Sequence, residues 1–345
     1  MRDIDVFLTG GTGFIGRWLL SELTADGQRV AVLLRGGGNR IGELCSWIEA
    51  HGGRGDLIHG LAGDLAAPGL GLDAGDRALA RTTRRVFHLG AAMSFGLAPE
   101  IAAQVNVKGS ERITELAASA PHLRRLVLLS GFQHRRSGWL TANRYHDSKL
   151  DADTLVRQLA HARGVPLTTV HPGPVVGDSR TGETTQFWGW PTLVRALHRG
   201  RLPIVPGGPG HWFPLLAVDY LARFLAGAPQ LDETLDGQYW LLHDATPPLH
   251  ELLTAVADEL GVRAPRLRVP VPLAALGLRA GLDRWTGLPA EALTFVSDDR
   301  FPTAEAHHVA TALDLTEPDP IHLARTTARF LTVNGFQAAA PQRQP

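Results

Sequence analysis

Short apolar runs alternate with amphipathic helical stretches through the first half of the chain. The runs lie at residues 5–10, 29–35, 84–92, 124–131 and 167–173. Apolar runs of this length separated by helices are typical of βαβ units around a parallel sheet. The pattern therefore predicts an α/β fold with a doubly wound parallel sheet, in which ligands bind just beyond the carboxyl ends of the strands.

The length of the chain, 345 residues, exceeds what one ordinary core needs, so we expect a second, smaller lobe. Residues 1–177 should form the Rossmann-type domain, completed by about 213–243. The substrate-binding lobe should comprise 178–212 and 244–335, and 336–345 should be a frayed tail.

A glycine-rich turn follows the first apolar run and opens the first helical stretch, 14–27. It reads TGGTGFIG, with glycines at 10, 13 and 16. Glycine permits the tight turn and a close approach to a pyrophosphate, while the helix N-terminus presents N–H groups to it. We therefore predict a dinucleotide site that includes Gly10, Thr12, Gly13, Phe14, Ile15 and Gly16.

The second run ends in Arg35, where the adenosine ribose should lie. A carboxylate there would bind the 2′-hydroxyl of NAD, whereas a guanidinium can bind the 2′-phosphate of NADP, so NADPH is preferred over NADH. Arg40 could assist Arg35 in binding this phosphate. The alternative is that Arg35 is only a solvated side chain at the end of a strand. Asp64 and Leu65 should lie near the adenine, although GDL is also a turn sequence. The segment HLGAA, which includes Ala91, is small and unbranched and should pass beside the cofactor. The alternative is that its small side chains only allow close packing.

Composition excludes several classes of function. The 34 basic and 34 acidic residues cancel, which leaves no basic field for nucleic acid. Cys45 is the single cysteine and the histidines show no HExxH pairing, so we expect neither a disulfide nor a metal site. No apolar stretch reaches the ~18 residues of a membrane span, and the first residues lack a secretory signal pattern. A soluble, cytoplasmic protein is expected.

Tyr145 and Lys149 stand four residues apart in TANRYHDSK. On a helix this spacing places both side chains on one face, where they can act on one substrate. The chain has only two lysines, Lys108 and Lys149, among its 34 basic residues. A phenol is a poor acid or base at neutral pH, and a nearby ammonium favours its anion. The pair is therefore a candidate for catalysis, and a structural pair is the alternative.

Six motifs together resemble those of the extended short-chain dehydrogenase/reductase family, over residues 1–335. They are TGGTGFIG, GDL, HLGAA, VNVKG, YHDSK and PGPVVGDSRTG. The segments VVGDSRTGE (175–183) and WFPLLAVDYLARFLAG (212–227) look most like the branch of thioester reductases and fatty acyl reductases.

The resemblance implies roles for several of these residues. Tyr145 would exchange the proton on the substrate oxygen, and Lys149 would hold the nicotinamide ribose and lower the pKa of the phenol. Asn106 would support a water or backbone link behind Lys149. The alternative is that Asn106 caps a helix. Pro172 would face the nicotinamide, and His171 stands where the family often has arginine.

The sequence departs from the family at the third catalytic position, where Gly131 replaces the usual Ser or Thr. We predict that Ser130 supplies the missing hydroxyl, with His134, a water or the substrate as alternatives. Arg135 and Arg136 follow in a short loop, where they could meet the phosphates of a carrier or coenzyme.

Four aromatic side chains of the predicted lobe suit an apolar or planar substrate, although they could equally form its core. They are Trp188, Trp190, Trp212 and Phe213.

These observations predict an NADPH-dependent reductase of a carbonyl group or an acyl thioester, with a free or a carrier-bound substrate. Two alternatives remain: an NAD-dependent epimerase or isomerase of the same fold, which Arg35 disfavours, and a non-catalytic NADP-sensing regulator, which Gly131 keeps open. The oligomeric state is not predicted.

Overall fold

The computed structural model describes residues 4–36, 40–93, 98–133 and 144–337. Seven parallel strands form the main sheet, in the spatial order β3-β2-β1-β4-β5-β6-β8. In chain order they are β1 (Val6–Thr9), β2 (Val30–Leu34), β3 (Ile58–Ala62), β4 (Arg85–His88), β5 (Arg125–Leu129), β6 (Leu167–Pro172) and β8 (Gln238–Leu241). β1, β2, β5 and β6 are buried along their whole length, which explains why β1, β2 and β5 are mostly apolar. β6 also buries the polar side chains of Thr168, Thr169 and His171.

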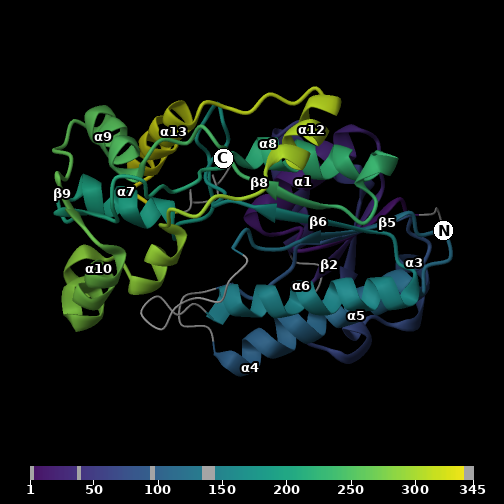
Figure 1. Ribbon diagram of the computed structural model, residues 1–345. Helices are drawn as coiled ribbons and strands as arrows, with labels where there is room; N and C mark the ends of the chain where they lie inside the picture. Colours follow the sequence, from purple (N-terminus) through teal and green to yellow (C-terminus); the bar gives the residue numbers. More distant parts are fainter. Residues whose placement is uncertain (1–3, 37–39, 94–97, 134–143, 338–345) are drawn as a thin grey trace.

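Helices cover both faces of this sheet (Figure 1). On one face α1 packs against α2 and α8, while on the other α5 packs against α6. The helices of the Rossmann part are α1 (Phe14–Ala25), α2 (Ile41–Ala50), α3 (Ala74–Ala80), α4 (Pro99–Ile101), α5 (Lys108–Ala118), α6 (Arg144–Arg163) and α8 (Val218–Gly227). The predicted fold class, a doubly wound parallel sheet with an added lobe, is confirmed.

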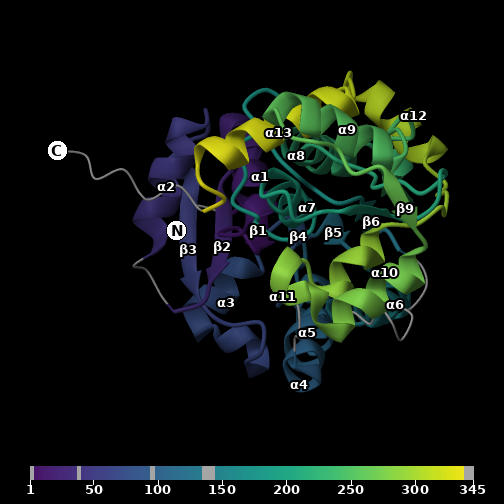
Figure 2. The same cartoon turned by 90° about the vertical axis from the view of Figure 1, so that its left-hand side faces the viewer.

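The lobe stands at one end of the sheet, and Figure 2 faces it directly. It contains a small parallel pair of strands, β7 (Ile204–Pro206) and β9 (Leu267–Val269). Its helices are α7 (Trp190–His198), α9 (Leu249–Leu260), α10 (Val271–Gly277), α11 (Asp283–Thr286), the 3-10 helix η9 (Ala290–Phe295) and α13 (Pro320–Val333). The remaining α-helix, α12 (Ala304–Ala312), packs on β8 beside the main sheet.

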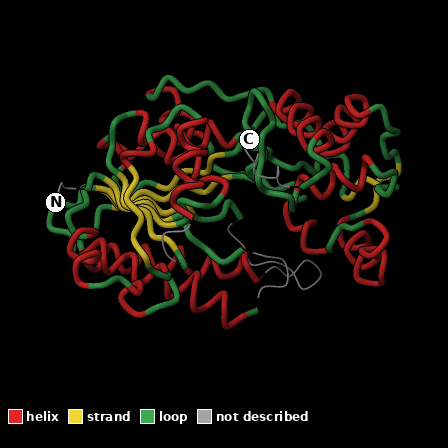
Figure 3. Tube along the Cα trace, turned by 180° about the vertical axis from the view of Figure 1, so that it is seen from behind, coloured by secondary structure: helices red, strands yellow, loops and turns green. Residues whose placement is uncertain are grey.

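The chain leaves the Rossmann part after β6 and returns to it for α8 and β8, so the lobe is built from two stretches. From behind, Figure 3 shows the strands of the main sheet gathered on one side and the helices of the lobe on the other. The exact boundary between the two parts stays a prediction. No helix in the described ranges combines the length and the apolar character needed to cross a bilayer.

Candidate active site

A cavity of about 620 Å³ lies at the carboxyl edge of the main sheet, between the Rossmann part and the lobe. It brings together fourteen residues that the sequence analysis proposed for catalysis or cofactor binding. They are Gly10, Thr12, Gly13, Phe14, Ile15, Gly16, Arg35, Asp64, Leu65, Ala91, Ser130, Tyr145, Lys149 and Pro172. Their location is therefore common to one site, while the role of each stays a prediction.

The turn after β1 fits a bound pyrophosphate. Gly10 has a φ of +79°, which only glycine adopts without strain, and a Cβ there would lie 2.7 Å from the backbone nitrogen of Gly90. A Cβ on Gly16 would lie 2.1 Å from the carbonyl oxygen of Gly10. The turn is thus closely packed at two of its glycines and leaves the start of α1 facing the cavity, where backbone N–H groups suit a phosphate.

Two arginine side chains also line the cavity. Arg35, just after β2, and Arg40, just before α2, are both exposed and both line the cavity. The carboxylate of Asp64 accepts a hydrogen bond from the Ala66 N–H at 2.9 Å, so GDL forms a turn and lines the cavity as well. HLGAA is closely packed, because a Cβ on Gly90 would lie 2.8 Å from Leu65. Ala91 lines the cavity, and its place beside a cofactor stays a prediction.

Tyr145 and Lys149 lie one turn apart at the start of α6, and burial governs the ionisation of both. The ammonium of Lys149 donates a hydrogen bond to the carbonyl of Leu129 at 2.5 Å. Burial lowers the pKa of Lys149 to about 8, partly opposed by the carboxylate of Asp153. Burial also raises the pKa of Tyr145 to about 12. Desolvation of the phenolate is the cause of this rise, and the effect of Lys149 on the phenol stays a prediction.

Ser130 and Gly131 lie just after β5, where the sequence departs from the family pattern. Ser130 lines the cavity, and its buried hydroxyl has no hydrogen-bond partner in the described part of the chain. A Cβ added to Gly131 would meet only His146 Nδ1, at 4.0 Å, so the space of the usual hydroxyl residue is available. His171 does not line the cavity; its Nδ1 lies 2.8 Å from the Gly131 carbonyl oxygen, which it holds in place. The remaining alternative, His134, lies outside the described residues, as do Arg135 and Arg136.

A buried hydrogen-bond chain links the end of β1 to the first turn of α6. It runs from Thr9 Oγ1 to His88 Nδ1 (2.7 Å), from His88 Nε2 to Ser110 Oγ (2.8 Å), and from the Ser110 hydroxyl to the Asn106 carbonyl (2.5 Å). Burial lowers the pKa of His88 to about 3, so this imidazole is neutral. Since the Ser110 hydroxyl donates to Asn106, His88 Nε2 must carry the proton and donate to Ser110.

Asn106 continues the hydrogen-bond chain toward α6. Its Nδ2 donates to the Ala92 carbonyl and to Ser148 Oγ, and its Oδ1 accepts from the Ala92 N–H at 2.7 Å. The hydroxyl of Ser148 in turn donates to the carbonyl of Tyr145 at 2.8 Å. Asn106 lies in a π-helical turn just before α5, whose N-cap residue is Val107, so the Asn106 side chain braces the start of α6 rather than capping a helix.

Aromatic rings form the lobe side of the cavity. Trp188 meets Tyr145 edge to face, with ring centroids 6.4 Å apart, and Phe295 lies 6.0 Å from both Trp188 and Phe213. Trp188, Trp190, Phe213 and Phe295 all line the cavity. Trp212 does not: it is fully buried, and its indole N–H donates to the Asp299 carbonyl, so the lobe-core interpretation holds for that residue.

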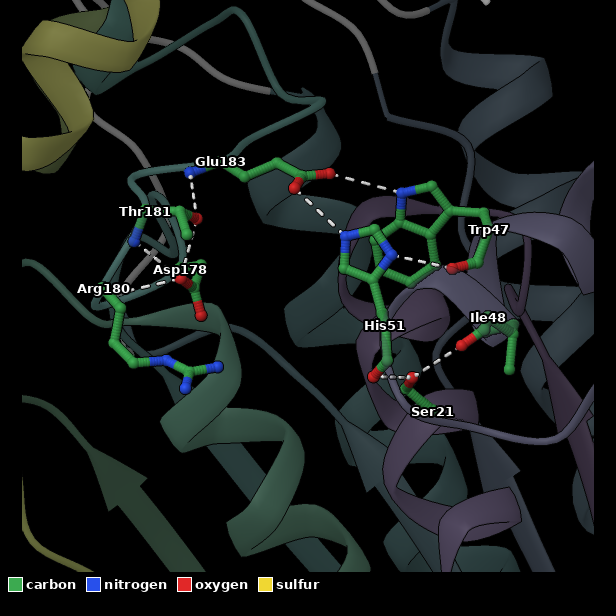
Figure 4. Close-up of polar contacts among 8 residues, drawn as sticks. All are labelled: Ser21, Trp47, Ile48, His51, Asp178, Arg180, Thr181 and Glu183. Carbon is green, nitrogen blue, oxygen red and sulfur yellow. Dashed lines mark hydrogen bonds and ion pairs between the residues drawn. The ribbon is translucent and has the colours of Figure 1, made fainter. Parts of the chain in front are cut away.

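The GDSRTG motif forms a turn outside the cavity lining (Figure 4). The carboxylate of Asp178 accepts hydrogen bonds from the N–H groups of Arg180 and Thr181. Glu183, at the end of the turn, accepts from Trp47 Nε1 at 3.3 Å and lies 3.1 Å from His51 Nε2, both on or next to α2. The motif therefore fastens the segment after β6 to the helix that follows Arg40.

Sequence reasoning missed several residues of the cavity wall. Phe132, Gln133 and Phe295 line it, and Phe295 comes from η9, far from every motif. His146 lines it too, next to Tyr145. The motif YHDSK contained that signal, since consecutive helical residues point about 100° apart and can flank the same cavity.

Comparisons with known proteins agree with this architecture. A family model described as male sterility protein, an NAD-binding type, matches residues 8–138 and 132–225. One of the proteins that make up the linear gramicidin synthase of Brevibacillus parabrevis is 27% identical over 283 residues, which is 73% of this chain and 5% of that protein. The fatty acyl-CoA reductase wat of Drosophila melanogaster is 25% identical over 278 residues, 65% of this chain and 53% of that protein. The chain thus spans only part of the length of these relatives. The resemblance to the thioester reductase and fatty acyl reductase branch, drawn from the motifs, is confirmed.

Solved structures share the fold over nearly the whole chain. The terminal R domain of the myxalamid PKS-NRPS pathway has a TM-score of 0.78 at 22% identity and covers 99% of this chain and 93% of its own. A thiolation-reductase di-domain from an archaeal non-ribosomal peptide synthetase has a TM-score of 0.73 at 15% identity, covering 98% and 77%. A UDP-galactose 4-epimerase reaches 0.64 at 17% identity, covering 96% and 99%. The fold alone therefore does not decide between reduction and epimerisation.

Proposed function

The chain belongs to the male sterility protein family of NAD(P)-binding domains, and on that premise we propose that it is an NADPH-dependent reductase of acyl thioesters. The observation that carries the proposal is the composition of one cavity. Its Rossmann side has the glycine turn and Arg35, and its lobe side has Tyr145, Lys149 and an aromatic wall. The two sides can hold a dinucleotide and a carbonyl group next to each other.

The chemistry requires a hydride at the carbonyl carbon and a proton at the oxygen. NADPH, when bound, supplies the hydride. The pKa of Tyr145, about 12, keeps the phenol protonated at neutral pH, so Tyr145 is suited to donate a proton rather than to remove one. Addition of both gives a hemithioacetal, which loses the thiol and leaves an aldehyde, with one NADPH and one proton consumed per thiol released. Proton donation by Tyr145 favours net reduction over an epimerase reaction, in which the hydride returns to the substrate.

The wall beside Tyr145 favours a compact, planar acyl group over a long alkyl chain. Trp188 meets the phenol of Tyr145 edge to face, and Phe295 packs on Trp188. The same cavity must also hold the reactive end of the cofactor. Aromatic rings gain additional stabilisation from one another beyond the area they bury. A free aromatic ketone or aldehyde is the second candidate, because the same wall would hold it.

The direct test incubates the protein with NADPH and either an aromatic acyl thioester or the matching ketone and aldehyde. We expect NADPH oxidation with the thioester, accompanied by one free thiol per NADPH consumed. NADPH oxidation with the ketone alone would move the assignment to a carbonyl reductase. Absence of turnover on all three substrates, with tight NADPH binding retained, would favour the sensing role.

Cofactor binding is expected to weaken as the pH rises through about 8. Below that value Lys149 carries its positive charge and attracts the ribose oxygens, and above it the neutral amine loses that attraction. The dissociation constant of NADPH, measured by nucleotide fluorescence between pH 7 and 9.5, should therefore increase with pH. The variant Lys149→Ala should bind more weakly and show no inflection in this window. A flat profile for the unaltered protein would contradict a cofactor contact by Lys149.

Ser130 should supply the hydroxyl that Gly131 lacks. Ser130→Ala is expected to lower turnover at least about tenfold, because the substrate oxygen loses a hydrogen-bond donor. The double variant Ser130→Ala/Gly131→Ser should recover much of the activity, since the nearest atom to a new Cβ at 131 is 4.0 Å away. Steady-state kinetics with thioester and NADPH measure both effects. If Ser130→Ala is silent, the hydroxyl role passes to another group lining the cavity.

A further inference from the structure

An unusual surface lies on the lobe between residues 263 and 287. Nine large hydrophobic side chains are exposed in the described part of the chain, and five of them fall in this short segment. They are Leu267, Leu273, Leu276, Leu282 and Trp285. Scattered exposed hydrophobics need no explanation, whereas a concentration of this kind marks an interaction site.

The same segment is strongly basic. Arg263, Arg266, Arg268, Arg279 and Arg284 are all exposed. Asp283 is the only acid between 263 and 287, so the segment carries a formal charge of +4 in a chain whose net charge is zero. We call this combination of five apolar and five arginine side chains the lobe surface.

Local structure keeps the apolar side chains available. Leu273 and Leu276 are three residues apart in α10, which places them on one side of that helix. Leu282 is the N-cap residue of α11 and precedes Trp285 by three residues. The inward face is already used, because Ala274, Ala275 and Leu278 are buried in the lobe core. Arg201 donates a hydrogen bond to the backbone carbonyl of Trp285 at 3.4 Å and adds a further cation near this segment.

The lobe surface is connected to the cavity. Figure 1 shows α10 at the outer edge of the lobe, away from the main sheet, and the chain returns from α11 to η9. Phe295, the last residue of η9, lines the cavity. Phe295 lies ten positions after Trp285 in the chain, and the last six of these positions form the 3-10 helix η9. The two residues are therefore at most roughly 30 Å apart. A partner bound at the lobe surface could therefore reach the cavity through a flexible arm.

We propose that the lobe surface docks an acidic carrier domain that presents the thioester on its pantetheine arm. This inference rests on the proposed function and names the partner for it. The argument is charge complementarity around an apolar centre: arginines meet the partner's carboxylates and steer the encounter, while Leu276 and Trp285 provide the desolvated contact. Arginine is favoured in such interfaces because its guanidinium pairs bidentately with carboxylates.

The test compares one acyl group on two thiols: free pantetheine, and the pantetheine arm of a net-negative thiolation domain. The double variant Arg268→Glu/Arg284→Glu is expected to lower kcat/KM for the carrier-bound thioester at least about tenfold and to flatten its salt dependence. The free pantetheine thioester should be reduced as by the unaltered protein. Trp285→Ser should give the same selective loss through its apolar contact.

The matched control is Arg84→Glu/Arg163→Glu, which makes the same charge change. Both arginines are exposed, and they precede β4 and β6, at the opposite edge of the main sheet from the cavity. This variant should reduce both substrates normally. A loss for the carrier-bound substrate as large as in the lobe variant would show that only net charge matters and would overturn the proposal.

Other outcomes separate this proposal from the function on which it rests. If the unaltered protein reduces neither thioester, the proposed function fails, and binding of the same thiolation domain to the lobe variant still decides the docking surface. If reduction of the carrier-bound thioester is unchanged in the lobe variant, the docking surface is wrong. Loss of binding to anionic vesicles by that variant, with unchanged carrier kinetics, would assign the surface to a lipid headgroup. A shift of the unaltered protein from dimer to monomer in that variant, again with unchanged kinetics, would assign it to a second copy of the chain.

Discussion

Tyr145→Phe is expected to lower turnover by about 10²–10⁴-fold, because the proton donor to the substrate oxygen is lost while the ring is kept. NADPH affinity should stay within a factor of about two, since the missing hydroxyl acts on the substrate and the edge-to-face contact with Trp188 remains. Single-turnover kinetics and a fluorescence titration with NADPH measure the two quantities separately.

The control for this prediction is Lys149→Ala, which should reduce both turnover and NADPH affinity. The ammonium of Lys149 is buried and bonded to Leu129, so its loss also leaves that carbonyl without its partner. A fully active Tyr145→Phe would remove Tyr145 from the mechanism and leave YHDSK as a structural sequence.

Arg35→Asp is expected to weaken NADPH by about 2–4 kcal/mol, or roughly 30- to 1,000-fold in dissociation constant. The change removes a charge-assisted contact to the 2′-phosphate and adds a repulsive carboxylate at the same place. NADH has a hydroxyl there, so its affinity should change little or improve. Titration of both nucleotides against both proteins gives the four dissociation constants needed.

A matched control for the charge change is Arg84→Asp, an exposed arginine at the opposite edge of the sheet. It should leave both nucleotides unaffected. Equal losses for NADPH and NADH in Arg35→Asp would contradict a contact to the 2′-phosphate and leave the preference for NADPH without support.

The sheet was predictable because its strands are buried on both faces. β1, β2 and β5 consist mostly of apolar residues, which a solvated element would not need. Glycine is required at 10 and 16, because a Cβ there would come as close as 2.1 Å to another backbone atom. The family motifs then located the cavity, because motif residues at strand ends converge at one edge of a parallel sheet.

Two features of the site could not be read from the sequence. Phe295 reaches the cavity from a 3-10 helix in the lobe, and no local pattern indicates a contact with a site whose Tyr145 lies 150 residues earlier in the chain. The pKa values of Tyr145 and Lys149 also could not be predicted from the sequence. A motif places a phenol and an ammonium near each other, but the desolvation that sets both pKa values depends on how completely the fold covers them.

The lobe surface illustrates a third limit. Leucines and arginines in the segment from 267 to 285 are compatible with an amphipathic helix packed on its own domain, and only the structure shows that the apolar residues at 273, 276, 282 and 285 remain exposed. Sequence periodicity indicates that two faces exist, whereas packing decides which of them has a partner.

The central claim is net hydride transfer to a thioester carbon, and isotopic labelling tests it most directly. The protein should be incubated with NADPH carrying deuterium at the transferable position and an aromatic acyl thioester, and the products analysed by mass spectrometry. The account predicts one deuterium on the former carbonyl carbon of the aldehyde, with equal amounts of NADP⁺ and free thiol. Unlabelled thioester recovered with unchanged NADPH, or hydride returned to a substrate of the same oxidation state, would contradict it.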